Sequence, residues 1–252
     1  MKPMFLFLSI LIGNLCVGNL WAQHPFTTDD RHFTVTPQPA TESNSNQLTA
    51  ETNQIPAEAK KPVVLNFDYL PMSPWVPYNC SPPSATATAS HGILTIDSPA
   101  SACYEYDLWY PEGIWHKYVS NKRGWVVETS LQIDPSTMDI NFDGAVRVWI
   151  HDHTNLLIVG FNTTEIFLAY PEHVSFPMNT TDSFHIYRIE AKEKRVWVYV
   201  DGHLAIDHTL STIGAGSNDL MFGDGSAYLG RSSLTRWDYF SYEVFPHPAL
   251  RE

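Results

Sequence analysis

The chain has 252 residues, and its acidic side chains outnumber the basic ones, which gives a formal net charge of −12 at pH 7. This charge argues against nucleic acid and anionic membrane surfaces as partners, because their phosphates attract basic proteins. The length is sufficient for a domain with a substantial hydrophobic core.

Residues 1–22 have the organisation of a signal peptide. Lys2 provides a short positive region, Phe5–Val17 is an apolar run, and Ala22 offers a small residue before a cleavage point. The apolar run is shorter than the roughly 20 residues that a membrane-spanning helix needs, and no later stretch is long and apolar enough. We therefore expect a protein without a membrane span that is secreted, or periplasmic or at a cell surface, after cleavage.

Residues 23–61 are rich in Thr, Ser, Asn, Gln and Pro and poor in aliphatic residues. Such a segment cannot bury enough apolar surface to offset the entropy lost on ordering. We predict a flexible leader here, then one folded domain over residues 62–247 and a short tail over residues 248–252.

Two cysteines, Cys80 and Cys103, remain after the predicted cleavage, and neither belongs to a CxxC motif. In an oxidising compartment two such cysteines usually pair, so we predict a disulfide; a metal or redox pair is the alternative. Asn162 and Asn179 lie in glycosylation sequons, which matter only if the host glycosylates exported proteins.

Short alternating runs separated by turn residues fill the folded domain, and no segment keeps an apolar period of 3.6 residues. This pattern, without helical crossovers, predicts an all-β fold, a two-sheet antiparallel β-sandwich. The expected strands are Val63–Tyr69, Gly92–Asp97, Ala102–Leu108, Gly124–Ile133, Ala145–His151, Leu156–Phe161, Glu165–Tyr170, three strands within Phe184–Leu210, Asp219–Phe222 and Trp237–Phe245.

The clearest hairpin signal lies within Phe184–Leu210, where Asp201 and Gly202 stand between two alternating runs. In the run Arg195–Val200, three valines alternate with an arginine and two aromatic residues. This strand is therefore predicted to have one face in the core and one polar, aromatic face.

Several segments resemble the concanavalin A-like lectin/glucanase superfamily. The superfamily's hairpin, FHxYxIE…vxfYvDG, is similar to FHIYRIEAKEKRVWVYVDGHL, which begins at Phe184. Its preceding strands resemble Gly124–Ile133 and Asp143–Val146, and its closing strand resembles Phe222–Gly225 and Trp237–Tyr242. The resemblance covers nearly the whole folded domain and implies a jelly roll, a fold that hosts lectins, hydrolases, lyases and inert modules.

Laminarinase-type members of this superfamily carry ExDxxE on one strand, and this motif is absent here, as is the RxELR-type strand of alginate lyases. The nearest catalytic candidate is Glu128, whose neighbours on the same face are Ser130 and Gln132. The resemblance therefore implies a lectin-like protein that binds a poly- or oligosaccharide. A polysaccharide lyase or glycoside hydrolase of the same fold is the alternative, and a structural or adhesion module is a further one.

The candidate ligand-binding face lies on the predicted strand Ala145–His151. Arg147, Trp149 and His151, followed by His153, alternate with aliphatic residues and are predicted to share one side of the sheet. A tryptophan ring can stack on a sugar, while Arg and His donate hydrogen bonds. A solvated outer face with no ligand is the alternative.

Trp109–Tyr118 is predicted to be an aromatic loop beside this face, with Trp115 or Trp109 as further ligand-binding residues. Packing of the loop over the edge of the sandwich is the alternative. A lyase would need a Tyr or His base and a cation for a uronate carboxylate. The residues that could fill these roles are His116, Tyr118, Arg147 and His151.

Three parts of the sequence are candidates for metal binding. Residues 151–153, His-Asp-His, place two histidines on one face but turn the Asp away. Residues 139–144, DINFDG, match the first half of a calcium loop without its final Glu, so a turn is the favoured interpretation. The resemblance implies a possible structural calcium at Asp238, with Asp68 close to it if the first and last strands meet. No cofactor is expected to be required.

Overall fold

The computed structural model describes residues 61–80, 84–100, 102–108, 113–139, 146–169, 172–211, 218–225 and 231–244. The predicted signal peptide, nearly all of the leader and the tail lie outside these residues, as does Trp109. No helix within the described ranges is long and apolar enough to cross a membrane.

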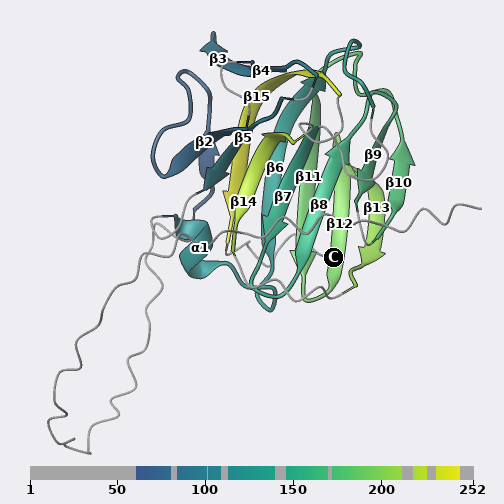
Figure 1. The fold of residues 1–252 in the computed structure, drawn as a ribbon. Helices are drawn as coiled ribbons and strands as arrows, with labels where there is room; N and C mark the ends of the chain where they lie inside the picture. Colours follow the sequence, from purple (N-terminus) through teal and green to yellow (C-terminus); the bar gives the residue numbers. More distant parts are fainter. Residues whose placement is uncertain are drawn as a thin grey trace, which may run out of the picture. The chain divides into compact units, whose positions relative to one another are not determined.

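Two antiparallel sheets form the domain (Figure 1), as the sequence predicts. Sheet A has the order β13-β12-β11-β6-β15-β4-β3, with β1 paired to β15, and sheet B has the order β10-β9-β8-β7-β14-β5-β2. The strands of sheet A are β1 (Val63–Leu65), β3 (Thr86–Ser90), β4 (Ile93–Ser98), β6 (Trp125–Ile133), β11 (His185–Lys192), β12 (Arg195–Val200), β13 (His203–Thr209) and β15 (Ser233–Glu243). The strands of sheet B are β2 (Trp75–Asn79), β5 (Tyr104–Leu108), β7 (Val146–His151), β8 (Leu156–Phe161), β9 (Glu165–Leu168), β10 (Val174–Pro177) and β14 (Leu220–Asp224), and the short helix α1 spans Ile114–Tyr118.

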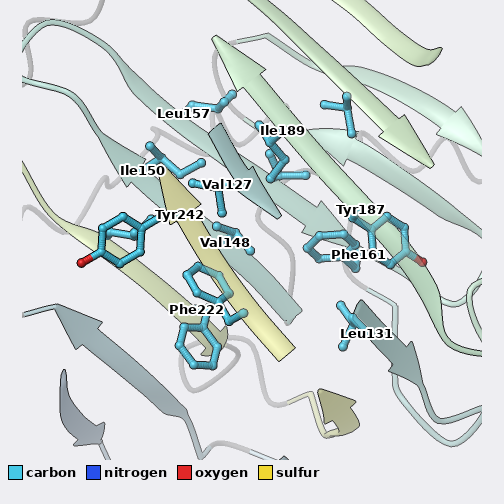
Figure 2. Close-up of a cluster of buried hydrophobic side chains, with 14 of the residues drawn as sticks. Val127, Leu131, Val148, Ile150, Leu157, Phe161, Tyr187, Ile189, Phe222 and Tyr242 are labelled. Carbon is cyan, nitrogen blue, oxygen red and sulfur yellow. The ribbon is translucent and has the colours of Figure 1, made fainter. Parts of the chain in front are cut away.

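The core lies between the sheets and is built by the two-residue alternation of their strands. Figure 2 shows Val127 of β6 and Ile189 of β11 together with Val148 of β7 and Phe222 of β14, and all four are fully buried. Burying one such side chain stabilises the fold by about 1.5–3 kcal/mol. Each strand that supplies these residues therefore turns its alternate side chains outward.

The predicted hairpin is confirmed. β12 and β13 are joined by Asp201 and Gly202, whose φ values are 50° and 80°. Two consecutive residues with positive φ match the twist of antiparallel strands, which favours Asp-Gly here. The valines of β12 are buried and its other residues are not, so the predicted alternation is also confirmed.

Three strands, β2, β3 and β10, were not predicted, and each lies at the edge of its sheet. β2 contains Pro77, which cannot donate a ladder hydrogen bond and is tolerated only at an edge or a bulge. β3 consists of Thr, Ala and Ser, and β10 has only four residues. Edge strands carry weak patterns because they bury little side-chain surface.

The predicted disulfide between Cys80 and Cys103 is present, with the two Cα atoms 5.5 Å apart. It links the end of β2 to the segment that leads into β5. The two cysteines are 23 residues apart in sequence. A disulfide that closes a loop of this length stabilises the folded protein by on the order of 3 kcal/mol. The bond therefore holds two neighbouring strands of sheet B together at one end.

The two sequons differ in accessibility. Asn162 is only 2% exposed, and its amide donates to Glu165 at 3.2 Å. Asn179 is exposed on the turn that follows β10. In the folded protein, Asn179 is therefore the accessible sequon, and its use remains a prediction.

Candidate functional site

The outward side of β7 carries three of the predicted ligand-binding residues. Val146, Val148 and Ile150 are buried in the core, whereas Arg147, Trp149 and His151 are only partly buried. The predicted shared face of these three residues is therefore confirmed.

The strand order adds acidic residues to this face. Arg147 is paired across the sheet with Gly223 of β14, which is paired in turn with Glu105 of β5. In the next row, Trp149 is linked in the same way to Asp107. Residues directly opposite each other in a sheet point to the same side. We name the resulting surface the polar face of sheet B, formed by Glu105, Asp107, Arg147, Trp149, His151 and Asp219.

Arg147 is held by a two-point ion pair with Glu105. Its Nε lies 2.8 Å from Oε1 and its Nη2 lies 3.2 Å from Oε2, and the side chains are only 17% and 5% exposed. The bridge passes over Gly223, and a Cβ atom at Gly225 would overlap the guanidinium. Glycines on β14 and just after it therefore provide the space that this pair occupies.

Trp149 lies between the charged and apolar parts of the surface. The guanidinium carbon of Arg147 is 5.0 Å from its ring centroid, and the ring of His151 is 5.7 Å away, edge-to-face. On the other side, Trp149 packs on a small cluster that contains Ile158 and Phe167. A ligand would contact the part of the indole that these neighbours leave uncovered.

Asp107 is the titratable group with the most altered environment on this face. Burial, followed by the charges of Asp219 and Glu105, raises its pKa to about 6. Its Oδ1 is buried and has no hydrogen-bond partner. Asp107 is therefore a carboxyl that changes protonation close to neutral pH and retains an unused acceptor.

His151 is oriented from two directions. Its Nδ1 lies 3.2 Å from the carboxylate of Asp219, and its carbonyl accepts a 3.1 Å hydrogen bond from the indole of Trp115. These contacts fix the end of β7 against α1 and bring Asp219 onto the polar face of sheet B.

The prediction that Trp115 binds ligand is wrong. Trp115 is fully buried in the core, where its ring packs edge-on against Trp125 and Tyr242 at 5.6 and 5.7 Å. The predicted loop contains α1, and this short helix turns Trp115 inward. Trp109 lies outside the described residues.

The prediction that His153 shares the outward face of β7 is wrong. β7 ends at His151, and His153 lies in the following turn with a φ of 71°. Its Nε2 accepts a 2.6 Å hydrogen bond from Asn218, which also donates to the carbonyl of His116. Burial and the nearby His116 lower the pKa of His153. The Tyr118 ring packs against the ammonium of Lys117.

Glu128 lies on the outer face of sheet A, so the sandwich separates it from the polar face of sheet B. Its carboxylate accepts hydrogen bonds from Arg188 at 3.2 Å and from Tyr239 at 2.9 Å, and Arg188 also pairs with Glu190 at 2.7 Å. Glu128 is therefore part of an ion-pair network on the other sheet, and it cannot act on the same ligand as His151.

No group of three or more His, Cys, Asp or Glu side chains suited to a metal ion occurs in the described part of the chain. Asp152 is buried and accepts hydrogen bonds from Trp125 and Asn155, which gives it a structural role. β1 pairs with β15, but it ends at Leu65, so Asp68 does not lie on the first strand as predicted; Asp238 is exposed at a bulge in β15. The calcium at Asp238 and Asp68 stays a prediction, and most of residues 139–144 lie outside the described residues.

No protein-family model and no curated protein sequence matches the chain. Solved structures do share its fold. The catalytic domain of an endo-1,3-beta-glucanase (laminarinase) from Thermotoga petrophila RKU-1 matches 73% of this chain and 97% of its own length, with a TM-score of 0.51 and 13% identity. "Cellulose induced protein, Cip1" matches 72% of this chain and 97% of its own length, with a TM-score of 0.50 and 8% identity. The domain has the concanavalin A-like jelly-roll fold, and at these identities the likeness shows the fold alone.

Proposed function

We propose that the protein binds a neutral oligo- or polysaccharide on the polar face of sheet B. One observation carries the proposal: Asp107, whose carboxylate oxygen is buried without a partner, lies among ionisable side chains on the outside of the sandwich. Burying charged groups without complete pairing costs stability. Such clusters are therefore typical of functional sites.

The charges of this face favour a neutral sugar over a uronate. Glu105, Asp107 and Asp219 contribute three negative charges when ionised, against one positive charge from Arg147 and at most one from His151. Arg147 is already engaged by Glu105 through two contacts, so it is not open to a second carboxylate. A polyuronate would meet a surface of the same sign, which argues against the lyase alternative.

Apolar and polar contacts are both available to a neutral sugar. Trp149 and the adjacent Leu156, which are both partly buried, offer apolar surface to the C–H groups of a pyranose. Asp107 and Asp219 offer carboxylate oxygens to its hydroxyl groups, and charge-assisted hydrogen bonds of this kind are the stronger ones.

Cleavage of a glycosidic bond is the second candidate function, favoured by the environment of Asp107. A pKa of about 6 suits a general acid that works near neutral pH. Asp219 is close enough to raise that pKa and would be the second carboxylate.

The test combines binding and product formation. Neutral oligosaccharides of β-linked glucose, mannose and xylose, with oligouronates beside them, would be titrated into the full chain by calorimetry while reducing ends are assayed. We expect a neutral series to bind and Trp149→Ala to weaken that binding at least about tenfold. New reducing ends would identify the enzyme.

Trp197→Ala is the matched control, because Trp197 is a half-buried tryptophan on the outer face of sheet A. It should leave binding unchanged. Loss of binding in Trp197→Ala but not in Trp149→Ala, or stronger binding of oligouronates, would contradict the proposal.

Asp107→Asn is expected to make the protein more stable at pH 7, by up to about 3 kcal/mol, because one unit of pKa corresponds to about 1.4 kcal/mol. The pKa of Asp107 is higher in the folded state than its ordinary value of 3.8, so the folded state holds the proton more tightly. The stability of the wild type should therefore fall as the pH rises from about 4 to 6 and then level off. Urea unfolding of both proteins over this pH range measures the difference, which should vanish below about pH 4.

Export is part of the proposal. The Cys80–Cys103 disulfide supports it, because structural disulfides persist in oxidising compartments and are rare in the cytosol.

A further inference from the structure

A concave site that shares no residue with the polar face of sheet B lies at the edge of the sandwich, where β10 of sheet B meets β13 of sheet A. Its volume is about 370 Å³, which lies within the range of small-molecule sites. Its apolar lining consists of Phe176, Met178, Val200 and Ala205. All four also pack on the main core or belong to it, so the pocket opens from the core towards solvent. We name it the edge pocket.

Four ionisable residues line the edge pocket, Asp182, His185, Asp201 and His203, and the first three are in contact with one another. His185 lies between two carboxylates, with Nε2 2.9 Å from Asp182 and Nδ1 2.7 Å from Asp201. Burial opposes protonation of His185, but the hydrogen bonds with Asp201 and Asp182 outweigh it and raise its pKa. With the imidazole protonated, the three side chains together carry one negative charge.

The acidic side chains remain open to solvent although the histidine is not. Asp182 and Asp201 are 57% and 47% exposed, whereas His185 is 14% exposed. Asp201 also accepts a hydrogen bond from the amide of Ile186 at 2.9 Å, which fixes the carboxylate at the rim. The rim thus presents oriented carboxylate oxygens to anything that enters.

Tyr187 lies next to His185 and packs behind the wall that His185 forms. Its side chain is fully buried, and its hydroxyl has no hydrogen-bond partner. Burial, and then the charges of Asp201 and Asp182, raise its pKa. Its ring lies 6.2 Å from the ring of His185, measured between centroids, but Tyr187 is not among the residues that line the edge pocket. Figure 2 shows the ring of Tyr187 beside Phe161 with its hydroxyl at the end that faces away from Phe161. A buried hydroxyl without a partner is unfavourable for the stability of the fold.

We propose that the edge pocket binds a small organic ammonium ion with an apolar body. The ammonium group would lie at the rim against Asp182 and Asp201, and the apolar body would contact Phe176 and Met178. An anion would meet the net negative charge of the rim, and a neutral molecule of the same shape would gain only the apolar contacts. The charge of the ligand therefore distinguishes this site from a merely hydrophobic gap.

Three probes of one shape test the proposal: benzylammonium, benzyl alcohol and benzoate. Each would be titrated at neutral pH into the ¹⁵N-labelled full chain, and the amide resonances of Ile186 and Gly202 followed. Benzylammonium should bind about tenfold more tightly than benzyl alcohol, which corresponds to one charge-assisted contact, and benzoate should bind most weakly.

Asp182→Asn keeps a hydrogen-bond acceptor for His185 and removes the charge at an exposed position, so the fold is not threatened. It should abolish the preference for benzylammonium. Asp207→Asn is the matched control, because Asp207 is an acidic residue of β13 that pairs with Arg195 and is not part of the edge pocket. It should leave all three affinities unchanged.

Tyr187→Phe separates the stability of the pocket wall from the charge of the rim. Removal of the unpartnered hydroxyl should raise the melting temperature of the free protein and leave the preference for benzylammonium unchanged, because Tyr187 does not line the edge pocket. Equal affinities for the three probes, tightest binding of benzoate, or equal losses in Asp182→Asn and Asp207→Asn would overturn the proposal. Resonance shifts confined to the polar face of sheet B would overturn it as well.

Discussion

Replacing Glu105 by Gln is expected to lower the free energy of unfolding by about 3 kcal/mol. Glu105 is 5% exposed and neutralises Arg147, which is 17% exposed. Removing one partner of such a pair leaves an uncompensated charge in a site with little access to water, and costs of this size are typical. Urea unfolding with linear extrapolation measures the loss.

The matched control for Glu105→Gln is Asp207→Asn. Asp207 pairs with Arg195 through two contacts of 2.8 and 2.6 Å, but these side chains are 34% and 56% exposed. Water compensates an exposed arginine, so this variant should lose less than about 1 kcal/mol. Equal losses of unfolding free energy in Glu105→Gln and Asp207→Asn would show that the burial of Arg147 does not determine how much its ion pair stabilises the fold.

Glu105→Gln should also change the ligand preference of the polar face of sheet B. Without Glu105, the guanidinium of Arg147 becomes available to a carboxylate of the ligand, and Arg binds carboxylates through two parallel hydrogen bonds. Glu105→Gln should therefore bind oligouronates more tightly than the wild type does, and the bound oligouronate should restore part of the lost stability. The double variant Glu105→Gln/Arg147→Met should lack both effects, and uronate binding that persists in it would contradict this explanation.

Gly223→Ala is expected to cost at least about 3 kcal/mol of stability. Gly223 has a φ of 138°, where residues with a side chain are strained. A Cβ atom at this position would also overlap the carbonyl oxygen of Tyr104 on the neighbouring strand, and a backbone atom cannot move aside without shifting that strand. Because Gly223 lies between Glu105 and Arg147, the ion pair should be disturbed at the same time.

Gly202→Ala is the control that isolates the backbone contribution. Gly202 has a φ of 80° in the β12–β13 turn, and a Cβ atom there would meet nothing within 4 Å. Only the left-handed conformation should be penalised, by about 1 kcal/mol. Equal losses in Gly202→Ala and Gly223→Ala, measured by urea unfolding, would show that close contact between strands is not the cause at Gly223.

The sequence pattern alone indicated where the central strands run and which of their residues face the core. β7 is the best example, because Arg147 and Trp149 alternate with buried aliphatic residues over its whole length. The edge strands β2 and β10 were missed because an edge strand can be short or contain a proline. The same pattern was visible in β5, where Glu105 and Asp107 alternate with apolar residues, but nothing in it indicated a functional role.

The features that could be predicted from the amino-acid pattern are local: the alternation of the central strands, the Asp201-Gly202 turn and the pairing of the two remaining cysteines. Which strands are neighbours depends on the packing of the whole domain. β5, β14 and β7 are far apart in the chain, and only their pairing places Glu105 and Asp107 beside Arg147. The packing of the domain also places Glu128 on the opposite sheet and turns Trp115 into the core. The physical reason is that a two-residue period records which way a side chain points, whereas strand order depends on how whole apolar faces pack together.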